Sequence, residues 1–536
     1  MSTNVFSESS SIFKDKDRYG KAWSASSSSE ESDSDSEVDL GELNYREQEC
    51  AEWKTSGTLN KFPFTSVGQF NIGKAENPID FFEIMFNPLF ITTLVDSINT
   101  NATSVLAACN QPHSRINSWK HTTVKEIRIF IALLFHMGHI RLDKLNDYWK
   151  TDILFDLPFK NFMSRDRFLI LYQNLCFTDS NTYTSDYSRF TTPVINYFNS
   201  LMKNLVAPPK NLTISEILNR KLTIRENGHR YGVKLYVLTD TYGITHKMYL
   251  YSGTHDTDLR GKGHSEKIVL FLMQDLFNMG HSLYTDKYYN SVSLAEKLLE
   301  KRTYLTGTLK NNKVRNSSIA RVKLNKGTFL SWYNSRGVCI TNYKNVRNVL
   351  MISTEHHATI IECTNKHGGL RKAPKVFAEY KKSMMGGDRE NQILSYYPPS
   401  KKTAFKNIVI HVMQTMALNA FEMFNEQAKA FGDNGISYLD FRIEVIKNLL
   451  NINVNTLSVS NNISPHPTES RIEVSSEANI HLPECLPKND KGKSKRKDCR
   501  NCLKKRNVRK ATIFHCPLCI KKPGLCLKCF REYHNY

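Results

Sequence analysis

The chain has 536 residues, and its 40% hydrophobic and 11% aromatic content is ordinary for a globular protein, so several folded domains are expected. A formal net charge of +21 and a pI near 9.3 favour a polyanionic partner, most commonly nucleic acid, over a basic surface without a partner. The start MSTNVFSESSS is polar and the longest apolar runs are short, so no signal peptide or membrane span is expected, and the sequence predicts a soluble, intracellular protein.

Residues 1–70 lack hydrophobic periodicity and are predicted to be a disordered tail rich in serine and acidic residues. Within it, the tract SASSSSEESDSDSEVD at 24–39 carries six acidic residues in its last ten positions. Acidic residues after serines suit an acid-directed kinase, and phosphorylation would add negative charge. A solvated tail without a regulatory role is the alternative.

Residues 71–230 are predicted to be mainly helical, because apolar residues recur there at helical spacing. The clearest helical segments lie at 77–102, 123–152, 163–177 and 192–206.

The pattern changes at Tyr231, where two strand-like stretches, YGVKLYVLTD and ITHKMYLYSG, flank a turn. A helix capped by Ser265 and closed by Gly280, a short strand at 283–285 and a helix to about Lys301 follow. This order predicts an α/β layer structure over residues 231–302.

The rest of the chain alternates between strand-rich, helical and polar stretches. Residues 303–377 are predicted to be a β-rich insertion, after which 378–404 return to the α/β core. Strong helical patterns follow within 405–455, and residues 456–495, rich in Asn, Ser and Pro, read as a linker with a basic run.

Three aspartates are candidate site residues. Asp240 and Asp286 each end a predicted strand, and Asp388 follows the flexible MMGG. Carboxylates are the ligands that magnesium prefers, and two such ions about 4 Å apart can cleave a phosphodiester. Without further information, however, a single aspartate at a strand end is more often a cap or a surface residue.

Several motifs, in this order and at these spacings, resemble the piggyBac family of transposases. They are NPIDFFEIMF, MGHIRLDKLNDYW, MSRDRF, YGVKLYVLTD, GHSLYTDKYYNSVSLAEKL, GTLKNN, MMGGDRENQ and the cysteine-rich tail. Together they span about 77–431 and 499–536.

The resemblance implies a multidomain α/β protein with an RNase H-like catalytic core that a β insertion interrupts. Helical segments around the core would form a DNA-binding and dimerisation domain. The family's Asp-Asp-Asp triad would match Asp240, Asp286 and Asp388, holding Mg²⁺ or Mn²⁺. The implied activity is cut-and-paste transposition of double-stranded DNA, with hairpins on the terminal inverted repeats and insertion at TTAA. A homodimer in the nucleus is expected.

Some positions depart from the family pattern. A second Asp after the triad is replaced by Asn391, and a downstream Trp by Phe405. A frequent Asp-Glu pair appears as Ser215-Glu216, and the segment from 216 to 231 is short by a few residues. These departures favour the alternative function, a domesticated DNA-binding or chromatin protein without transposition activity.

The tail contains three C-x2-C pairs followed by a histidine, which predicts a RING- or PHD-like cross-brace with two Zn²⁺ ions. The proposed ligands are Cys499, Cys502, Cys516, Cys519, Cys526, Cys529 and His534. The eighth ligand stays open, because His515 could be a ligand or a surface residue. A ubiquitin ligase or histone reader is an alternative function, but the resemblance favours recognition of transposon-end DNA.

The approach to the tail is basic, with twelve Lys or Arg against two Asp between Lys488 and Lys510. This stretch could be a nuclear localisation signal, a phosphate-binding stretch or a solubilising linker. The candidate DNA-binding residues are Lys495, Arg496, Lys497, Lys504, Lys505 and Arg506.

Overall fold

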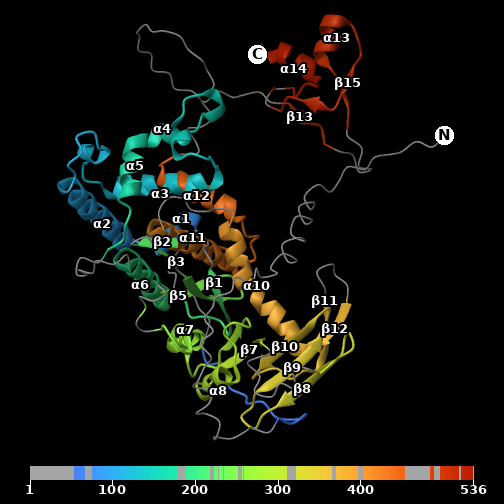
Figure 1. The fold of residues 1–536 in the computed structure, drawn as a ribbon. Helices are drawn as coiled ribbons and strands as arrows, with labels where there is room; N and C mark the ends of the chain where they lie inside the picture. The colour runs from blue at the N-terminus through green and yellow to red at the C-terminus, as the bar shows by residue number, and fades with distance from the viewer. Residues whose placement is uncertain are drawn as a thin grey trace. The chain divides into compact units, whose positions relative to one another are not determined.

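The computed structural model describes two compact units, within residues 1–457 and 458–536 (Figure 1). The described residues are 53–66, 75–178, 188–217, 223–226, 229–232, 234–251, 256, 259–310, 322–364, 370–395, 404–452, 483–487, 495–517, 519 and 521–534. The acidic tract at 24–39 lies outside them, as does most of the predicted linker.

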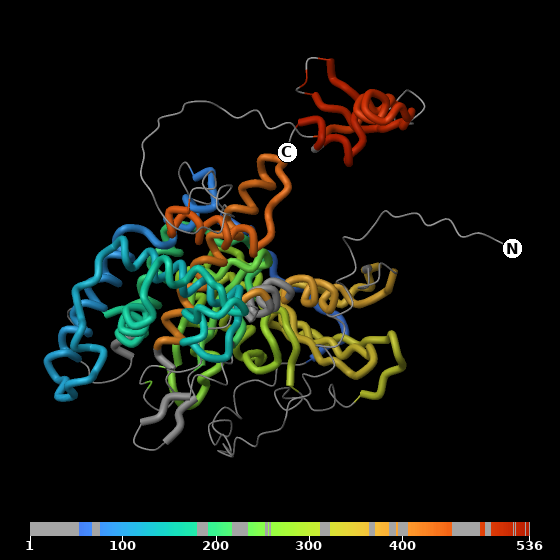
Figure 2. Tube along the Cα trace, turned by 90° about the horizontal axis from the view of Figure 1, so that it is seen from above, coloured from blue at the N-terminus to red at the C-terminus, as the bar shows by residue number. Residues whose placement is uncertain are grey.

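The helical part of the first unit is built from segments at both ends of its sequence. Its helices are α1 (Pro78–Met85), α2 (Pro88–Ala107), α3 (Val124–His139), α4 (Phe159–Phe162), α5 (Arg165–Gln173), α6 (Ser188–Leu205), α11 (Ala404–Ala430) and α12 (Tyr438–Leu449), with short 3₁₀ turns at Arg115–Ser118, Leu145–Trp149 and Ile153–Phe155. Helix α11 contacts α1 and α6, and α12 contacts α3, so that early and late segments lie side by side (Figures 1 and 2).

The sequence sets the starts of these helices through their caps. The side chains of Asn87, Thr123, Ser164 and Ser437 each accept a hydrogen bond from a backbone N–H in the first turn of the helix that follows. The buried faces are aromatic, and the rings of Phe82 and Phe86 stack with their centroids 4.1 Å apart. Each helical segment expected from periodicity contains a helix, but 77–102 is divided between α1 and α2, and the α-helix within 123–152 ends at His139.

In the described part of the chain, no single helix is long and apolar enough to cross a membrane. Helices α1 and α2 meet such a criterion only as a pair, and the pair is bent by 57° at its break.

An eight-stranded sheet forms the α/β part of the first unit, with the strand order β5-β4-β1-β6-β7-β10-β9-β8. Its strands are β1 (Asn211–Ile217), β4 (Lys234–Asp240), β5 (Thr245–Tyr251), β6 (Ser282–Thr285), β7 (Tyr304–Thr308), β8 (Phe329–Tyr333), β9 (Cys339–Lys344) and β10 (Asn348–Ser353). A separate hairpin joins β2 (Thr223–Glu226) to β3 (His229–Gly232). Strands β1, β2 and the start of β3 lie within 71–230, the region predicted to be mainly helical.

The two faces of the sheet are covered by different helices. Helices α7 (His264–Met273), which continues into a 3₁₀ turn at Gln274–Leu276, and α8 (Val292–Glu300) share a buried cluster with Leu212 and Leu238. Helix α10 (Lys375–Ser395) contacts β1, β4 and β6, and its Leu394 joins the cluster that contains Leu235 and Val237. Because successive strand residues point to opposite faces, α10 lies on the face opposite α7 and α8.

The region predicted to be a β-rich insertion is continuous with the central sheet. Strand β7 pairs in parallel with β6, and β10, β9 and β8 extend the same sheet beyond it. A further hairpin, β11 (Ile360–Thr364) with β12 (Leu370–Pro374), leads directly into α10. The expected strands are present, but β7 belongs to the core sheet.

Residues 53–66 form a strap that lies against the sheet, which corrects the expectation of disorder for this part of the tail. Lys54 exchanges two backbone hydrogen bonds with Tyr333 of β8, and Thr65 donates a backbone hydrogen bond to Met279. Gly280, at φ +79°, has no room for a side chain, since a Cβ there would lie 2.2 Å from the carbonyl oxygen of Pro63.

The second unit is small and is built around its cysteines. Its elements are β13 (Glu484–Cys485), β14 (Lys497–Asp498), α13 (Arg500–Arg506), β15 (Ala511–Thr512), β16 (Phe514–His515) and α14 (Leu527–His534). Strand β13 pairs with β16, and β14 pairs with β15. Five buried cysteines, with Leu525 and Phe530, form its core.

Candidate functional site

Strand directions bring charged residues from four strands to one edge of the sheet. Strands β1, β6 and β7 run parallel, whereas β4 runs antiparallel to β1. The carboxyl ends of β1, β6 and β7 therefore meet the amino end of β4. This edge, which we call the Asp286 edge, carries Ser215 and Glu216 near the end of β1, Lys234 at the start of β4, Asp286 after β6 and Lys310 after β7.

Asp286 is exposed and is held by the turn that follows β6. Its Oδ1 accepts a hydrogen bond of 2.7 Å from the backbone N–H of Tyr288. The buried Asn290 ties the ends of β6 and β7 together by donating to the carbonyl oxygens of Thr285 (3.1 Å) and Thr308 (2.8 Å). Gly307 makes room for this contact, because a Cβ there would lie 2.2 Å from Asn290 Nδ2. The position of Asp286 is thus fixed by its neighbours.

Ser215 occupies the place beside Asp286 on the neighbouring strand. The parallel pairs Leu212–Leu283 and Thr213–Tyr284, continued by two residues, put Ser215 level with Asp286 on the same face. Ser215 pairs with Val237 of β4, and that face is the one that α10 covers. The Ser215 hydroxyl is buried and has no hydrogen-bond partner among the described residues.

Glu216 lies at the same edge but faces α7 and α8, because it pairs with Tyr236 of their buried cluster. Its carboxylate lies 3.5 Å from the ammonium of Lys234. Burial raises the pKa of Glu216, Lys234 lowers it, and the nearby negative charge of Asp286 raises it further, with a net upward shift. The carboxyl groups of Glu216 and Asp286 thus interact electrostatically at the Asp286 edge.

Asp240 lies at the opposite edge of the sheet, and the structure does not bring it together with Asp286. Its antiparallel partner is Leu212, which is level with Leu283. Three residues separate that level from Asp286, or about 10 Å along the strand. This arrangement differs from the triad that the resemblance implies, in which Asp240 and Asp286 would hold the same metal ions.

The carboxylate of Asp240 is engaged in local structure. It is 1% exposed, and its Oδ1 accepts backbone hydrogen bonds from Tyr242, Gly243 and Ile244 at 2.8, 3.0 and 3.1 Å. Nε2 of His246 lies 2.9 Å from its Oδ2. These contacts make Asp240 the organiser of the β4–β5 turn.

Asp388 lies within α10, which passes over the face that carries Ser215, but its side chain is outside the described residues, as are those of Asn391 and Phe405. Two magnesium ions in a phosphodiester-cleaving site need several carboxylates at one place. Ser215 supplies a neutral hydroxyl beside Asp286, so the described side chains fit a two-ion site poorly.

The cysteine pairs of the second unit gather into two clusters. Cys499, Cys502, Cys526 and Cys529 form the first, with 3.4 Å between the sulfur atoms of Cys502 and Cys529. First and third pairs share this cluster, while the second pair belongs to the other one, which is the ligand order of a cross-brace. Four buried thiols at such distances fit a tetrahedral zinc ion.

Cys516, Cys519 and His534 form the second cluster. Nε2 of His534 lies 3.3 Å from Cys519 Sγ, and Nδ1 of its ring lies 2.9 Å from the carbonyl oxygen of Phe530. A hydrogen bond at the second nitrogen is the usual way in which a zinc-binding histidine is oriented. His515 is outside this three-residue cluster, and its Nδ1 lies 3.0 Å from the carbonyl oxygen of Glu484.

The six candidate DNA-binding residues are exposed on this second unit. Lys504, Lys505 and Arg506 form the last turn of α13, and Arg506 pairs with Glu532 at 2.9 Å. Lys497 donates to the carbonyl oxygen of Lys522 at 3.1 Å. These six positive charges therefore lie on the surface of the second unit, and two of them, on Lys497 and Arg506, are partly engaged.

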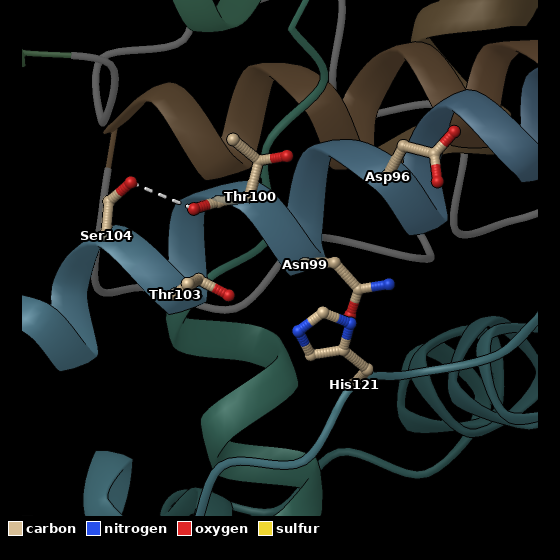
Figure 3. Close-up of a pocket in the computed structure, with 6 residues that line it drawn as sticks. All are labelled: Asp96, Asn99, Thr100, Thr103, Ser104 and His121. Atoms are coloured by element: carbon tan, nitrogen blue, oxygen red, sulfur yellow. Dashed lines mark hydrogen bonds between the residues drawn. The ribbon is translucent and has the colours of Figure 1, made fainter.

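A groove of about 510 Å³ runs along α2 and is lined mainly by hydroxyl and amide groups (Figure 3). Its lining residues are Asp96, Asn99, Thr100, Thr103, Ser104 and His121. The side chain of Asn99 is already bonded to the backbone of Thr122, and the only carboxylate of the lining is Asp96. This chemistry suits neither phosphodiester cleavage nor phosphate binding, so the groove is not a candidate site for either.

Comparison with known families shows which protein family the chain belongs to. A family model described as Transposase IS4 matches residues 77–421, and one described as a DDE_Tnp_1-like zinc finger matches residues 478–535. The chain belongs to this transposase family. A cryo-EM structure of a piggyBac transposase synaptic complex with hairpin DNA matches its fold with a TM-score of 0.60 at 18% identity, covering 87% of this chain and 98% of that chain.

These findings confirm the piggyBac-type resemblance and the multidomain α/β fold with a C-terminal zinc module. In this transposase-family chain, the sequence alone did not single out Lys234 and Lys310, which lie at the Asp286 edge. Both lysines lie at or just beyond a strand end, which the sequence indicates. That the two strand ends lie at the same edge depends on the directions of β4 and β7, which no motif encodes.

Proposed function

We propose that this transposase-family protein binds double-stranded transposon-end DNA and has weak or no strand-cleavage activity of its own. The observation that carries the proposal is Ser215, which stands level with Asp286 on the face under α10. The family resemblance puts an aspartate there. A bound magnesium or manganese ion would supply Lewis-acid activation of water and of the leaving oxygen. A neutral serine would hold such an ion less tightly than a carboxylate does.

Charge and similarity support the DNA partner. The protein whose fold matches was solved in a synaptic complex with hairpin DNA, and the net charge of +21 suits a polyanion. We therefore propose terminal inverted repeats and TTAA-containing target DNA as ligands, a homodimer as the assembly that binds them and the nucleus as the location. Two Zn²⁺ ions in the second unit would stabilise its DNA-binding surface.

A second candidate function is complete cut-and-paste transposition through hairpin intermediates. It is favoured by Asp286, which is exposed and firmly positioned beside lysines, as a metal-binding carboxylate near DNA should be. In this reading Asp286 and Asp388 would hold the metal ion, as the resemblance implies, and Ser215 and Asn391 would be tolerated changes.

Placing a carboxylate at position 215 distinguishes the two candidate functions. A hairpin oligonucleotide carrying TTAA would be incubated with full-length protein and Mn²⁺ or Mg²⁺, and hairpin opening followed on a denaturing gel. We expect wild type to match Asp286→Ala, whereas Ser215→Asp gains metal-dependent cleavage. The double variant Ser215→Asp/Asp286→Ala is the matched control and should lose that gain. Cleavage by wild type that disappears in Asp286→Ala would instead establish the second candidate.

A further inference from the structure

Tyr288 is fixed next to Asp286 with its ring partly exposed. Its backbone N–H bonds to Asp286, and its ring meets the buried ring of Tyr289 edge-on, with 5.2 Å between centroids and an angle of 88°. The edge of one ring against the face of the next is a favourable aromatic arrangement. Tyr288 is therefore held in place by the same turn that positions Asp286.

Two lysines from different strands approach this ring. The ammonium of Lys234 lies 5.7 Å from the ring centroid of Tyr288, and that of Lys310 lies 5.8 Å from it. Among the cation–ring pairs described in the structure, Tyr288 is the one ring that two lysines approach. The exposed Lys287 adds a third positive charge next to it. The negative charges at this edge are those of Glu216, which pairs with Lys234, and Asp286.

This combination matches a nucleotide with an unpaired base. An aromatic face can stack on any base, and lysines beside it can bind the phosphates on either side. We propose that Tyr288 is a stacking residue for an unpaired DNA base at the Asp286 edge, with Lys234 and Lys310 holding the flanking phosphates. The inference rests on the proposed binding of DNA and adds to it a preference for DNA with unpaired bases.

The chain contains a closely matched control. Tyr242 follows Asp240 as Tyr288 follows Asp286, its backbone N–H bonds to Asp240 Oδ1 at 2.8 Å, and its side chain is 45% exposed. It lies at the opposite edge of the sheet, and no lysine is described over its ring. A general effect of removing an exposed tyrosine from an Asp-x-Tyr turn would therefore appear in Tyr242→Ala as well.

The test compares two DNA probes with full-length protein at one salt concentration. One probe is a blunt duplex, and the other is the same duplex with a short single-stranded overhang that contains 2-aminopurine. We expect wild type to bind the overhang probe more tightly and to quench its fluorescence. Tyr288→Ala should lower affinity for the overhang probe about tenfold and leave duplex affinity unchanged. Tyr288→Trp should retain the preference, and Tyr242→Ala should behave as wild type.

Two further outcomes separate this inference from the proposal on which it rests. If the wild-type protein binds neither probe, the proposed DNA binding is wrong, and the stacking role is wrong with it. If wild type binds both probes equally without quenching, or if Tyr288→Ala keeps the full preference, the stacking role is overturned while DNA binding stands. The quenching measured with wild type does not depend on whether any variant folds. Lys310→Gln should weaken binding of the overhang probe and reduce the slope of its log affinity against log salt by about one.

Discussion

Asp240 and Asp286 show what a single residue's sequence context can and cannot indicate. Each ends a strand, and each is followed two residues later by a tyrosine whose backbone N–H it binds. Their sequence patterns are equivalent, but β4 and β6 reach opposite edges of the sheet. Strand direction, which depends on the whole sheet, makes one a buried turn residue and leaves the other exposed.

Asp240→Asn should therefore destabilise the protein. An amide has one acceptor oxygen, so it cannot accept from the three backbone N–H groups and also serve His246 as the carboxylate does. The expected loss is about 1–3 kcal/mol of unfolding free energy, measured by urea denaturation. Asp286→Asn, with its exposed carboxylate, is the control and should change stability little. Equal stability of wild type and Asp240→Asn would contradict the turn role.

At the scale of elements, amphipathic helices were the most predictable part of the fold. Helix α3 has an N-cap threonine and a regularly spaced apolar face, both readable from sequence. Strand β1 alternates Leu212 and Ile214 with polar residues, yet it lies beside a helical region and is only seven residues long. The strap was missed because its order comes from distant partners on β7 and β8, which no local pattern reveals.

One buried tyrosine contributes two of the hydrogen bonds that hold the strap. The Tyr304 hydroxyl donates to the carbonyl oxygen of Phe62 at 3.2 Å and accepts from the backbone N–H of Phe62, and the two rings lie 5.2 Å apart. Tyr304→Phe keeps the ring contact and removes both hydrogen bonds, at a cost of about 1 kcal/mol. Limited proteolysis should then cut faster within residues 53–66. Tyr333→Phe is the control: it leaves the backbone hydrogen bonds of Lys54 intact, so this variant should be cut at the same rate as the wild type.

At the scale of the whole molecule, the two units obtain their stability from different sources. The first unit has extensive apolar cores between its helices and on both faces of its sheet. The second has a core made largely of cysteines, which metal binding can hold together but apolar packing alone cannot. Sequence indicated this division, because the C-x2-C pairs can be read directly. The predicted cross-brace also implies that the first and third pairs share a cluster, and the cysteines of the structure are grouped in that order.

Removal of zinc should consequently unfold the second unit and spare the first. With a strong chelator, hydrogen exchange in residues 495–534 should lose its protection, whereas exchange in the central sheet should not change. Cys499→Ser/Cys502→Ser should do the same without chelator, because it removes two of the four thiols of the first cluster. Cys485→Ser is the matched control, since this cysteine is exposed and belongs to neither cluster. Protection that survives chelation in 495–534 would mean that the cysteine core folds without metal, and the zinc assignment would then fail.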